Sequence, residues 1–461
     1  MDAVTLGELA QVIGADCGEV NPLQTFRSVC TDSRTLQQGD VFWALSGPNF
    51  DGHDFINGAI DSGATAVVCS REGTGQSTAL QVESVRQALW DFATWYRGTL
   101  QGTVIGLTGS VGKTTTRQLI HDVLNSRYTA SQSPANFNNH FGVPLSILAA
   151  DSGDDFVVLE LGASAIGEIA ELATLAAPEI GVITNIADAH LHGFGSIDGV
   201  QRAKGELLEA LPDIGVAWLN GDDPRVREIA PRAACEVRFF GESEQADLRA
   251  SGVLAMESEL RFQLDGDQYS LDVPGRHYLT SALAAIAVAR ESGMLPSEIQ
   301  DGFRAFEPVT GRCSILQLGE ATLIDDTYNA SPLSVAAAVR SLANHKRHGQ
   351  RVLVLGDMAE LGEDAAGIHQ STGVACGQAG IDLILAHGLF APQIVAGVAE
   401  AGGPEAIAFE EIDDLYTALR ERLKSDVAVL VKGSRSSRME RVVEFLKSHI
   451  TPDALASHPD E

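Results

Sequence analysis

A strand, a glycine-rich loop and a helix follow one another between residues 103 and 124, and this order constrains the fold more than any other stretch. Residues 103–107 are short, β-branched and apolar, as a buried parallel strand should be. Residues 108–116 read TGSVGKTTT, and apolar side chains then recur at helical spacing as far as Leu124. Successive backbone N–H groups and the positive end of a helix would therefore point at one place. The stretch predicts a phosphate-binding loop in an α/β sheet.

The loop departs in one position from the pattern G-x-x-x-x-G-K-[ST]. The first glycine would stand at position 107, which is Leu, and Gly106 and Gly109 flank that position instead. The neighbouring strand and helix favour a phosphate site over a glycine-rich turn that binds nothing. In this reading the lysine supplies a positive charge and the following threonine supplies a hydroxyl for Mg²⁺. The nucleotide-binding candidates are Gly109, Ser110, Val111, Gly112, Lys113, Thr114 and Thr115.

Composition restricts the partners and the compartment. The chain has 461 residues, with 62 acidic against 32 basic side chains and a formal charge of −30. This charge opposes an extended nucleic-acid or anionic-membrane surface. The six cysteines show no C-x-x-C pair, and no basic and apolar leader or long apolar run is found in the sequence. We therefore expect a cytoplasmic protein with no nucleic-acid partner and no integral membrane segment.

The pattern of strands and helices predicts three α/β units, at residues 1–82, 83–312 and 313–461. In the second unit, apolar strands at 156–159, 180–183 and 215–219 alternate with helical segments, which predicts a mostly parallel sheet with helices on both faces. Alternating segments around Asp265-Gly266 predict a hairpin. The third unit repeats the alternation and is expected to be Rossmann-like, although it has no G-x-G-x-x-G fingerprint.

Three polar residues follow strands of the second unit, where ligands of open α/β sheets bind. They are Glu160, His190 and Lys204. A carboxylate after a strand of a P-loop domain commonly holds Mg²⁺ or orients its water. Each residue also has an ordinary alternative: an ion pair, a core histidine or a solvated helix lysine. Because all three lie at strand ends in one P-loop unit, they predict a catalytic site.

Several further motifs give the chain a family resemblance that spans nearly its whole length. Residues 161–169 (LGASAIGEI), 184–191 (TNIADAHL), 193–196 (GFGS) and 203–206 (AKGE) resemble the Mur ligase family. Residues 39–42 and 50–55 are similar to the UDP-sugar domain of that family. Residues 325–332, 355–362 and 432–435 are similar to its C-terminal domain. The resemblance implies a small UDP-substrate domain, a central P-loop ATPase domain and a C-terminal Rossmann-like ligase domain.

The activity that the resemblance implies is ATP-dependent amide bond formation through an acyl phosphate. Within the family, the motifs resemble the branch that joins D-alanyl-D-alanine to UDP-N-acetylmuramoyl-tripeptide in peptidoglycan precursor synthesis, and a monomer is expected. By this resemblance Lys113 and the loop amides hold the β- and γ-phosphates, and Thr114 with Glu160 holds one Mg²⁺. His190 and an N-carboxylated (carbamylated) Lys204 would serve a second Mg²⁺.

The resemblance also implies contacts from residues outside the P-loop. ATP is expected to meet three residues near or beyond the boundary between the second and third units: Arg312, Asp326 and Tyr328. The substrate is expected to meet Asn136, Asn138, Asn139, Lys432 and Ser434.

In the first unit, the segment Thr31-Asp32-Ser33-Arg34 has two interpretations. Asp and Ser favour turns on their own account, so it could be a surface turn. The hydroxyl of Ser33 and the guanidinium of Arg34 could instead bind an anionic part of the substrate.

One segment departs from the family pattern. In residues 275–282 (GRHYLTSA), Tyr278 and Ser281 stand where the family usually has asparagines, one of which is associated with adenine binding. Two other functions stay open: a folate polyglutamylating ligase of the same family and a non-catalytic nucleotide-binding regulator. About a hundred residues precede the P-loop, which argues against the folate branch. The presence of Glu160, His190 and Lys204 argues against the regulator.

Overall fold

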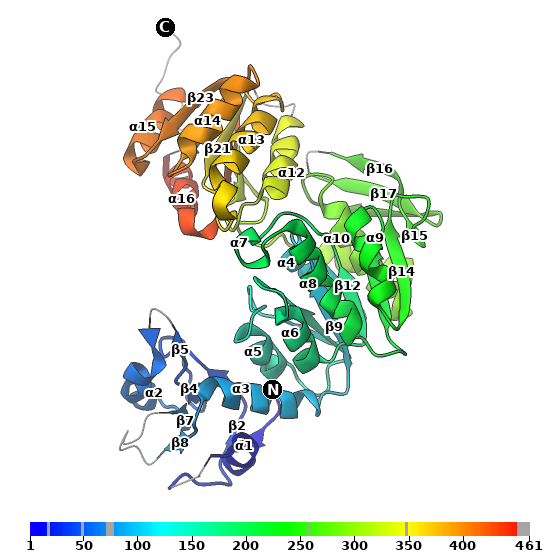
Figure 1. Cartoon of the computed structure of the whole chain (residues 1–461), viewed down its shortest axis with the longest axis vertical. Helices are drawn as coiled ribbons and strands as arrows, with labels where there is room; N and C mark the ends of the chain where they lie inside the picture. The colour runs from blue at the N-terminus through cyan, green and yellow to red at the C-terminus, as the bar shows by residue number, and fades with distance from the viewer. Residues whose placement is uncertain (16–18, 48–49, 71–77, 257, 346–348, 450–461) are drawn as a thin grey trace.

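Three α/β units follow one another along the chain in the structure, a computed structural model that describes residues 1–15, 19–47, 50–70, 78–256, 258–345 and 349–449. Figure 1 shows the first unit in blue at the bottom, the central unit in cyan and green, and the C-terminal unit in yellow to red at the top. The predicted three-unit α/β architecture is confirmed. The boundaries at residues 82 and 312 stay predictions.

The first unit is built on a four-stranded parallel sheet of order β3-β4-β7-β8. Its first helix begins at a capping box, in which Thr5 and Glu8 each accept a hydrogen bond from the backbone N–H of the other. Its strands are β1 (Val4–Thr5), β2 (Thr25–Phe26), β3 (Val29–Cys30), β4 (Val41–Trp43), β5 (Ser46–Gly47), β6 (Phe50–Asp51), β7 (Ala66–Cys69) and β8 (Ala79–Gln81). Its helices are α1 (Leu6–Ile13), the 3₁₀ helix η1 (Gly52–Phe55) and α2 (Ile56–Asp61), and α3 (Val85–Arg97) follows this unit along the chain.

Helix α3 joins the first unit to the central one. It begins at Ser84, whose hydroxyl accepts from the N–H of Gln87. Its apolar residues, such as Phe92, are buried together with Trp43 of the first sheet and Ile147 of the central unit. Figure 1 shows α3 lying across this junction. The first and central units therefore share one continuous apolar core, which fixes α3 relative to both.

The central unit contains a seven-stranded sheet of order β10-β11-β9-β12-β13-β14-β15, with every neighbouring pair parallel. One face packs on α3, α5, α6 and α8, and the other on α4, α10 and α11. The strands of this sheet are β9 (Thr103–Thr108), β10 (Ala130–Gln132), β11 (Phe156–Glu160), β12 (Ile180–Ile183), β13 (Val216–Asn220), β14 (Glu236–Gly241) and β15 (Leu248–Arg249). The helices are α4 (Lys113–Leu124), α5 (Gly142–Ala149), α6 (Glu168–Ala176), α7 (Leu191–Phe194), α8 (Ile197–Ala210), α9 (Pro224–Ile229), η2 (Ala230–Arg232), α10 (Tyr278–Glu291) and α11 (Pro296–Ala305).

A small antiparallel sheet is attached to the central unit. It consists of β16 (Ser251–Ala255), β17 (Leu260–Leu264) and β18 (Asp267–Leu271). The turn between β17 and β18 is Asp265-Gly266, and both residues have positive φ, at 52° and 91°. A two-residue hairpin turn of this kind requires such angles, which Asp and Gly tolerate. The predicted hairpin is confirmed, and β16 is an additional strand.

The C-terminal unit has a six-stranded sheet of order β19-β20-β24-β21-β22-β23, in which only β19 runs antiparallel to its neighbour. Helices cover both faces, so the Rossmann-like prediction is confirmed. The strands are β19 (Ser314–Leu318), β20 (Ala321–Asp326), β21 (Gln350–Gly356), β22 (Leu383–His387), β23 (Glu405–Phe409) and β24 (Val427–Lys432). The helices are α12 (Pro332–Ala343), η3 (Gly362–Asp364), α13 (Ala365–Gly377), α14 (Ala391–Glu400), α15 (Ile412–Arg422), η4 (Arg435–Ser437) and α16 (Glu440–His449).

Across the described ranges, no helix combines the length and the apolar character needed to cross a membrane. The five cysteines within these ranges are free thiols, and Cys17 lies outside them.

Candidate active site

A cavity of about 1050 Å³ lies between the central and C-terminal units and extends to α3. The carboxyl ends of β9, β11 and β12 open into it from the central sheet, and those of β20 and β24 from the C-terminal sheet. This is the edge at which open α/β sheets bind ligands. Its wall includes six of the seven P-loop candidates, Gly109 being the exception.

The P-loop has the backbone shape that phosphate binding requires. Gly112 has φ +80° at the N-cap of α4, a conformation that favours glycine. A Cβ at Gly109 would lie 2.0 Å from the hydroxyl oxygen of Thr184, so no side chain fits there. The loop therefore turns tightly out of β9 and places the N-terminus of α4 on the cavity.

Asn185, at the end of β12, holds the P-loop in place. Its Oδ1 accepts from Val111 N at 2.9 Å, its Nδ2 donates to Val111 O at 2.9 Å, and its backbone O accepts from Ser110 N at 3.0 Å. Asn185 lies in the motif at residues 184–191, and the sequence pattern alone assigns it no role. The contact joins residues more than seventy positions apart, and only the pairing of β9 with β12 brings them together.

Lys113 lies over its own loop. Its ammonium donates to the backbone O of Gly109 at 2.8 Å and of Ser110 at 3.3 Å. Burial lowers the pKa of Lys113 below its usual value. The arrangement places a cation beside the helix N-terminus, where a phosphate chain would complement both.

Glu160 ends β11 and is the centre of a buried polar cluster. Its Oε2 accepts from the hydroxyl of Thr114 at 2.8 Å, and its Oε1 accepts from the amide of Asn138 at 2.7 Å. The Arg117 guanidinium lies 3.8 Å from Oε2, a contact that the sequence did not suggest. Glu160 is 1% exposed, yet it lines the cavity. The hydroxyl and the carboxylate therefore meet at the foot of the P-loop.

These two oxygen donors suit a hard cation. Magnesium usually keeps several waters and binds one or two carboxylates plus substrate phosphates, so a complete protein cage is not needed. Consistent with this, no group of three or more His, Cys, Asp or Glu side chains that could hold a metal is found in the described part of the chain. Thr114 and Glu160 fit a Mg²⁺ that arrives with a nucleotide.

His190 lies at the boundary between the central and C-terminal units. It has a left-handed backbone, with φ 51°, at the N-cap of α7. Its Nδ1 contacts the carboxylate of Glu360, which follows β21 in the C-terminal unit. Burial lowers the pKa of His190, and the positive charges of Lys113 and Lys204 act in the same direction, whereas Glu360 raises it. His190 therefore faces the cavity and touches both units.

Lys204, on α8, is 2% exposed. Its Nζ lies 5.7 Å from the centre of the Phe194 ring, and no hydrogen-bond acceptor reaches it among the residues placed in the structure. The carboxylate of the nearby Glu206 accepts hydrogen bonds from the N–H groups of Gly167 and Ala170 at the start of α6 instead of from Lys204. Burial, reinforced by the charge of Lys113, lowers the pKa of Lys204 to about 7. A substantial fraction of this amine is therefore neutral near pH 7.

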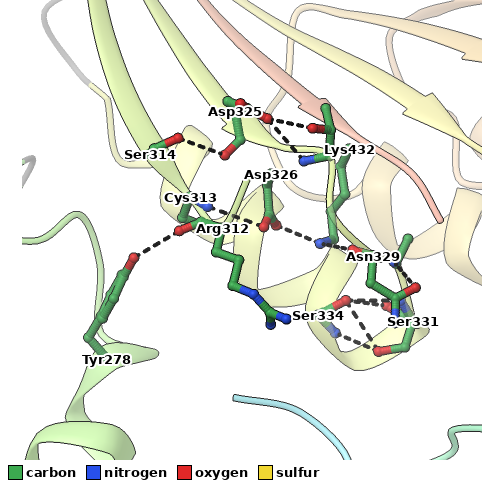
Figure 2. A network of polar contacts seen from close by, with 12 residues as sticks. Tyr278, Arg312, Cys313, Ser314, Asp325, Asp326, Asn329, Ser331, Ser334 and Lys432 are labelled. Atoms are coloured by element: carbon green, nitrogen blue, oxygen red, sulfur yellow. Dashed lines mark hydrogen bonds and ion pairs between the residues drawn. The ribbon is translucent and has the colours of Figure 1, made fainter. Parts of the chain in front are cut away.

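The C-terminal unit presents a second polar cluster to the cavity, shown in Figure 2. Asp326, at the end of β20, accepts from Lys432 Nζ at 2.5 Å and from Cys313 N at 3.2 Å. Lys432 also donates to the backbone O of Asn329 at 2.9 Å. This buried pair ties β20 to β24 at the cavity edge.

Arg312 lies beside this cluster, with its guanidinium carbon 4.1 Å from the centre of the Tyr328 ring. Figure 2 shows the Tyr278 hydroxyl donating to the backbone O of Arg312, at 3.1 Å. Ser281, the other departure from the family pattern, shares a 2.8 Å hydrogen bond with the hydroxyl of Thr116 on α4. Both departing side chains therefore use their hydroxyls inside the protein.

The remaining predicted residues fall into two groups. Asn136, Asn139 and Ser434 line the cavity, and Asn139 Oδ1 also caps the start of α5 by accepting from Phe141 N and Gly142 N. Ser33 and Arg34 are not on the cavity wall. They follow β3 in the first unit, where Arg34 pairs with Asp32 at 2.6 Å. Their role in substrate binding stays a prediction.

Together, a P-loop, a buried hydroxyl–carboxylate pair at its foot and a second α/β unit facing it define a nucleotide-dependent α/β enzyme. The family model described as "Mur ligase family, catalytic domain" matches residues 25–94. The "Mur ligase middle domain" model matches residues 107–289, and the model "Mur ligase, glutamate ligase domain" matches residues 311–435.

Known proteins resemble the chain over its full length. It is 37% identical to the UDP-N-acetylmuramoyl-tripeptide–D-alanyl-D-alanine ligase of Escherichia coli, over 98% of this chain and 100% of that protein. The crystal structure of MurF from Acinetobacter baumannii matches with a TM-score of 0.89 and 30% identity, covering 97% of this chain and 99% of the other. MurF from Thermotoga maritima in complex with ADP matches at 0.79 and 30%, covering 92% and 98%. The chain belongs to the Mur ligase family.

Proposed function

We propose that this protein joins D-alanyl-D-alanine to UDP-N-acetylmuramoyl-tripeptide with ATP, in peptidoglycan precursor synthesis. The observation that carries the proposal is the match over the whole length of both chains to ligases of that name, including the unit that precedes the P-loop. A folate polyglutamylating ligase is disfavoured because this first unit is present and matches the Mur ligase family model. A non-catalytic regulator is disfavoured because Thr114 and Glu160 meet beside the P-loop.

The chemistry requires that a carboxylate, which is a poor electrophile, first be activated. A carboxylate oxygen of the tripeptide attacks the γ-phosphorus of ATP, and ADP leaves, which produces an acyl phosphate. The amine of the dipeptide then attacks the acyl carbon, and the tetrahedral intermediate expels phosphate as the amide forms. Lys113 and the amides of the P-loop would hold the β- and γ-phosphates and stabilise the charge that develops on them.

Thr114 and Glu160 would hold a Mg²⁺, and His190 with Lys204 would serve a second. When bound, Mg²⁺ neutralises phosphate charge and orients the reacting oxygens. We propose that Lys204 is N-carboxylated: its amine is buried and its pKa is lowered to about 7, so a neutral amine is available to combine with CO₂. The resulting carbamate is an oxygen ligand that suits a hard cation, unlike an ammonium.

Other cavity residues would position the substrates. Arg312, Asp326 and Tyr328 would contact ATP from the C-terminal side. The residues assigned to the substrate in the cavity are Asn136, Asn138, Asn139, Lys432 and Ser434. Ser33 and Arg34 would act on the UDP part from the first unit. The protein is proposed to work as a monomer in the cytoplasm.

Mass spectrometry of the product tests the proposal. Purified protein with ATP, Mg²⁺ and UDP-N-acetylmuramoyl-tripeptide should convert D-alanyl-D-alanine into one amide product, whose mass is the sum of the substrates less one water. A parallel reaction with glutamate and a folate should yield no amide. An amide formed only in the folate reaction would contradict the proposal and assign the protein to the folate polyglutamylating ligases.

A further inference from the structure

Arg86, an exposed residue, lines the cavity at its end nearest the first unit. It lies in the first turn of α3, the helix that is packed against both the first and the central units. Trp90, one turn further along α3, donates from its indole N–H to the backbone O of His140 at 2.8 Å. Residues four apart lie on the same face of a helix, so Arg86 and Trp90 face the same loop. The loop at residues 136–141 is thereby fixed beside Arg86.

The guanidinium of Arg86 lies 5.8 Å from the centre of the Phe141 ring. A cation above an aromatic ring is weakly attracted to it, and the ring also orients the planar guanidinium. Phe141 is itself held, because its N–H donates to Asn139 Oδ1 at 3.0 Å. One face of the guanidinium therefore meets a fixed wall, and its N–H groups stay available to a ligand.

No carboxylate pairs with Arg86 anywhere in the described residues. The chain has 62 acidic and 32 basic residues, and several of its arginines are held in ion pairs. Examples are the ion pairs of Arg97 with Glu179, Arg127 with Glu298, Arg232 with Glu209, and Arg238 with Glu236. An unpaired guanidinium on the wall of a large cavity, in so acidic a protein, is suited to binding an anion.

Other cationic side chains line this cavity away from α3, among them Arg312, Arg340 and Arg435. Lys113 is at the P-loop, and Lys432 is paired with Asp326 on the C-terminal side. At the end formed by α3, the Glu171 carboxylate lies 2.8 Å from Nε2 of His140, and Arg86 is the arginine without a carboxylate partner there among the residues described. Arg34, the arginine predicted from the sequence, is paired with Asp32 and lies off the cavity wall.

We propose that Arg86 binds an oxyanion of the UDP-linked substrate at the point where the bound substrate extends from the first unit towards the P-loop. This inference rests on the proposed function, which supplies a substrate with two sources of oxyanions: the diphosphate and the carboxylates of the tripeptide. Both accept two parallel hydrogen bonds from a guanidinium. Arg86 is thus a substrate-binding residue at the junction of the first and central units.

Binding calorimetry tests the proposal with full-length protein and two ligands. UDP-N-acetylmuramoyl-tripeptide carries both kinds of oxyanion, whereas UDP-N-acetylglucosamine carries the diphosphate and no carboxylate. The variants are Arg86→Gln, which removes the charge, and Arg86→Lys, which keeps the charge but not the two-pronged geometry. Arg225→Gln is the matched control, because Arg225 is an exposed arginine on α9 away from the cavity.

We expect Arg86→Gln to weaken tripeptide binding about tenfold, Arg86→Lys to fall between it and wild type, and Arg225→Gln to bind as wild type. An equal loss with UDP-N-acetylglucosamine assigns the contact to the diphosphate, and a loss confined to the tripeptide ligand assigns it to a carboxylate. Unchanged binding of the tripeptide ligand by Arg86→Gln overturns the inference. If wild type itself fails to bind the tripeptide ligand, the proposed function falls as well, so the two failures are distinguishable.

Discussion

The imidazole Nδ1 of His190 in the central unit contacts the carboxylate of Glu360 in the C-terminal unit, across the boundary between two α/β sheets. Both residues have left-handed backbones, with φ of 51° and 62°. Such a backbone is uncommon outside glycine, so each side chain is held at a specific angle to its chain. The neighbouring α7 and η3 also pack together. The contact therefore links the arrangement of the two units to a residue of the candidate site.

The contact between His190 and Glu360 predicts how the central and C-terminal units move relative to each other. A partly exposed imidazole–carboxylate contact contributes at most about 1 kcal/mol, which can change the ratio of open to closed forms several-fold. We expect Glu360→Ala to increase the radius of gyration of the ligand-free protein in small-angle scattering. With an ATP analogue and the UDP substrate, wild type should become more compact, since a complete site needs both units. Glu363→Ala, in η3, is the control for a lost surface carboxylate. Identical scattering of Glu360→Ala and wild type without ligand would contradict the link.

The hydrogen bond between Thr114 and Glu160 beside the P-loop predicts that different substitutions of Thr114 reduce the catalytic rate to different extents. Thr114→Val keeps the shape but removes the hydroxyl that donates to Glu160 at 2.8 Å. We expect kcat to fall about 100-fold because the proposed oxygen ligand of Mg²⁺ is lost. Thr114→Ser, which keeps the hydroxyl, should retain most of the activity. The two rates, measured with saturating ATP over a range of Mg²⁺ concentrations, separate the role of the hydroxyl from packing. Equal rates for the Val and Ser variants would refute the assignment.

The proposed carbamate predicts chemical rescue at Lys204. Lys204→Ala should lose activity, and a short carboxylic acid such as acetate or formate should restore part of it by replacing the missing carboxylate. The same acid should not stimulate Lys204→Met, because the larger side chain fills the space. Full activity of Lys204→Ala without any acid would exclude an essential carbamate.

The buried amine of Lys204 also predicts how stability depends on pH. Its pKa is about 7 in the folded protein, and the ordinary value in an unfolded chain is about 10.4. Between these values the unfolded chain binds more protons, so the free energy of unfolding rises with pH. Lys204→Met removes this dependence. In CO₂-free buffer, the free energy of unfolding of Lys204→Met minus that of wild type should fall by about 3 kcal/mol from pH 6.5 to pH 9.5.

Calorimetric unfolding at the two pH values measures this difference. Lys424→Met, at an exposed lysine outside the site, should keep a constant difference from wild type. A stability difference for Lys204→Met that stays constant or grows with pH would show that the amine is not held neutral by burial.

The P-loop could be predicted from sequence because its parts are local. Strand β9, the glycines and α4 are consecutive, and each follows from short-range preferences. The hairpin at Asp265-Gly266 was predictable for the same reason, since its turn requires only two residues with positive φ. Buried strands such as β11 and β12 are continuous apolar runs, which also identifies them.

Contacts made across the fold could not be predicted in this way. Arg86 and Asn185 reach the site through helix packing and strand pairing, and the local sequence alone assigns neither of them a role there. The pairing of His190 with Glu360 joins residues far apart in the sequence and in different units. Edge strands such as β10 and β23 were missed because partial exposure weakens the apolar pattern. The sequence identifies chemical groups, and the topology decides which of them meet.

The most direct measurement of the central claim is phosphate release with ATP, Mg²⁺, UDP-N-acetylmuramoyl-tripeptide and D-alanyl-D-alanine, with each component left out in turn. The mechanism requires the tripeptide carboxylate to accept the phosphoryl group. The dipeptide amine then displaces phosphate from the acyl carbon. We predict sustained release in the complete mixture and loss of turnover when any one component is missing. Equal release without D-alanyl-D-alanine, or with glutamate and a folate in place of the two substrates, would contradict the assignment.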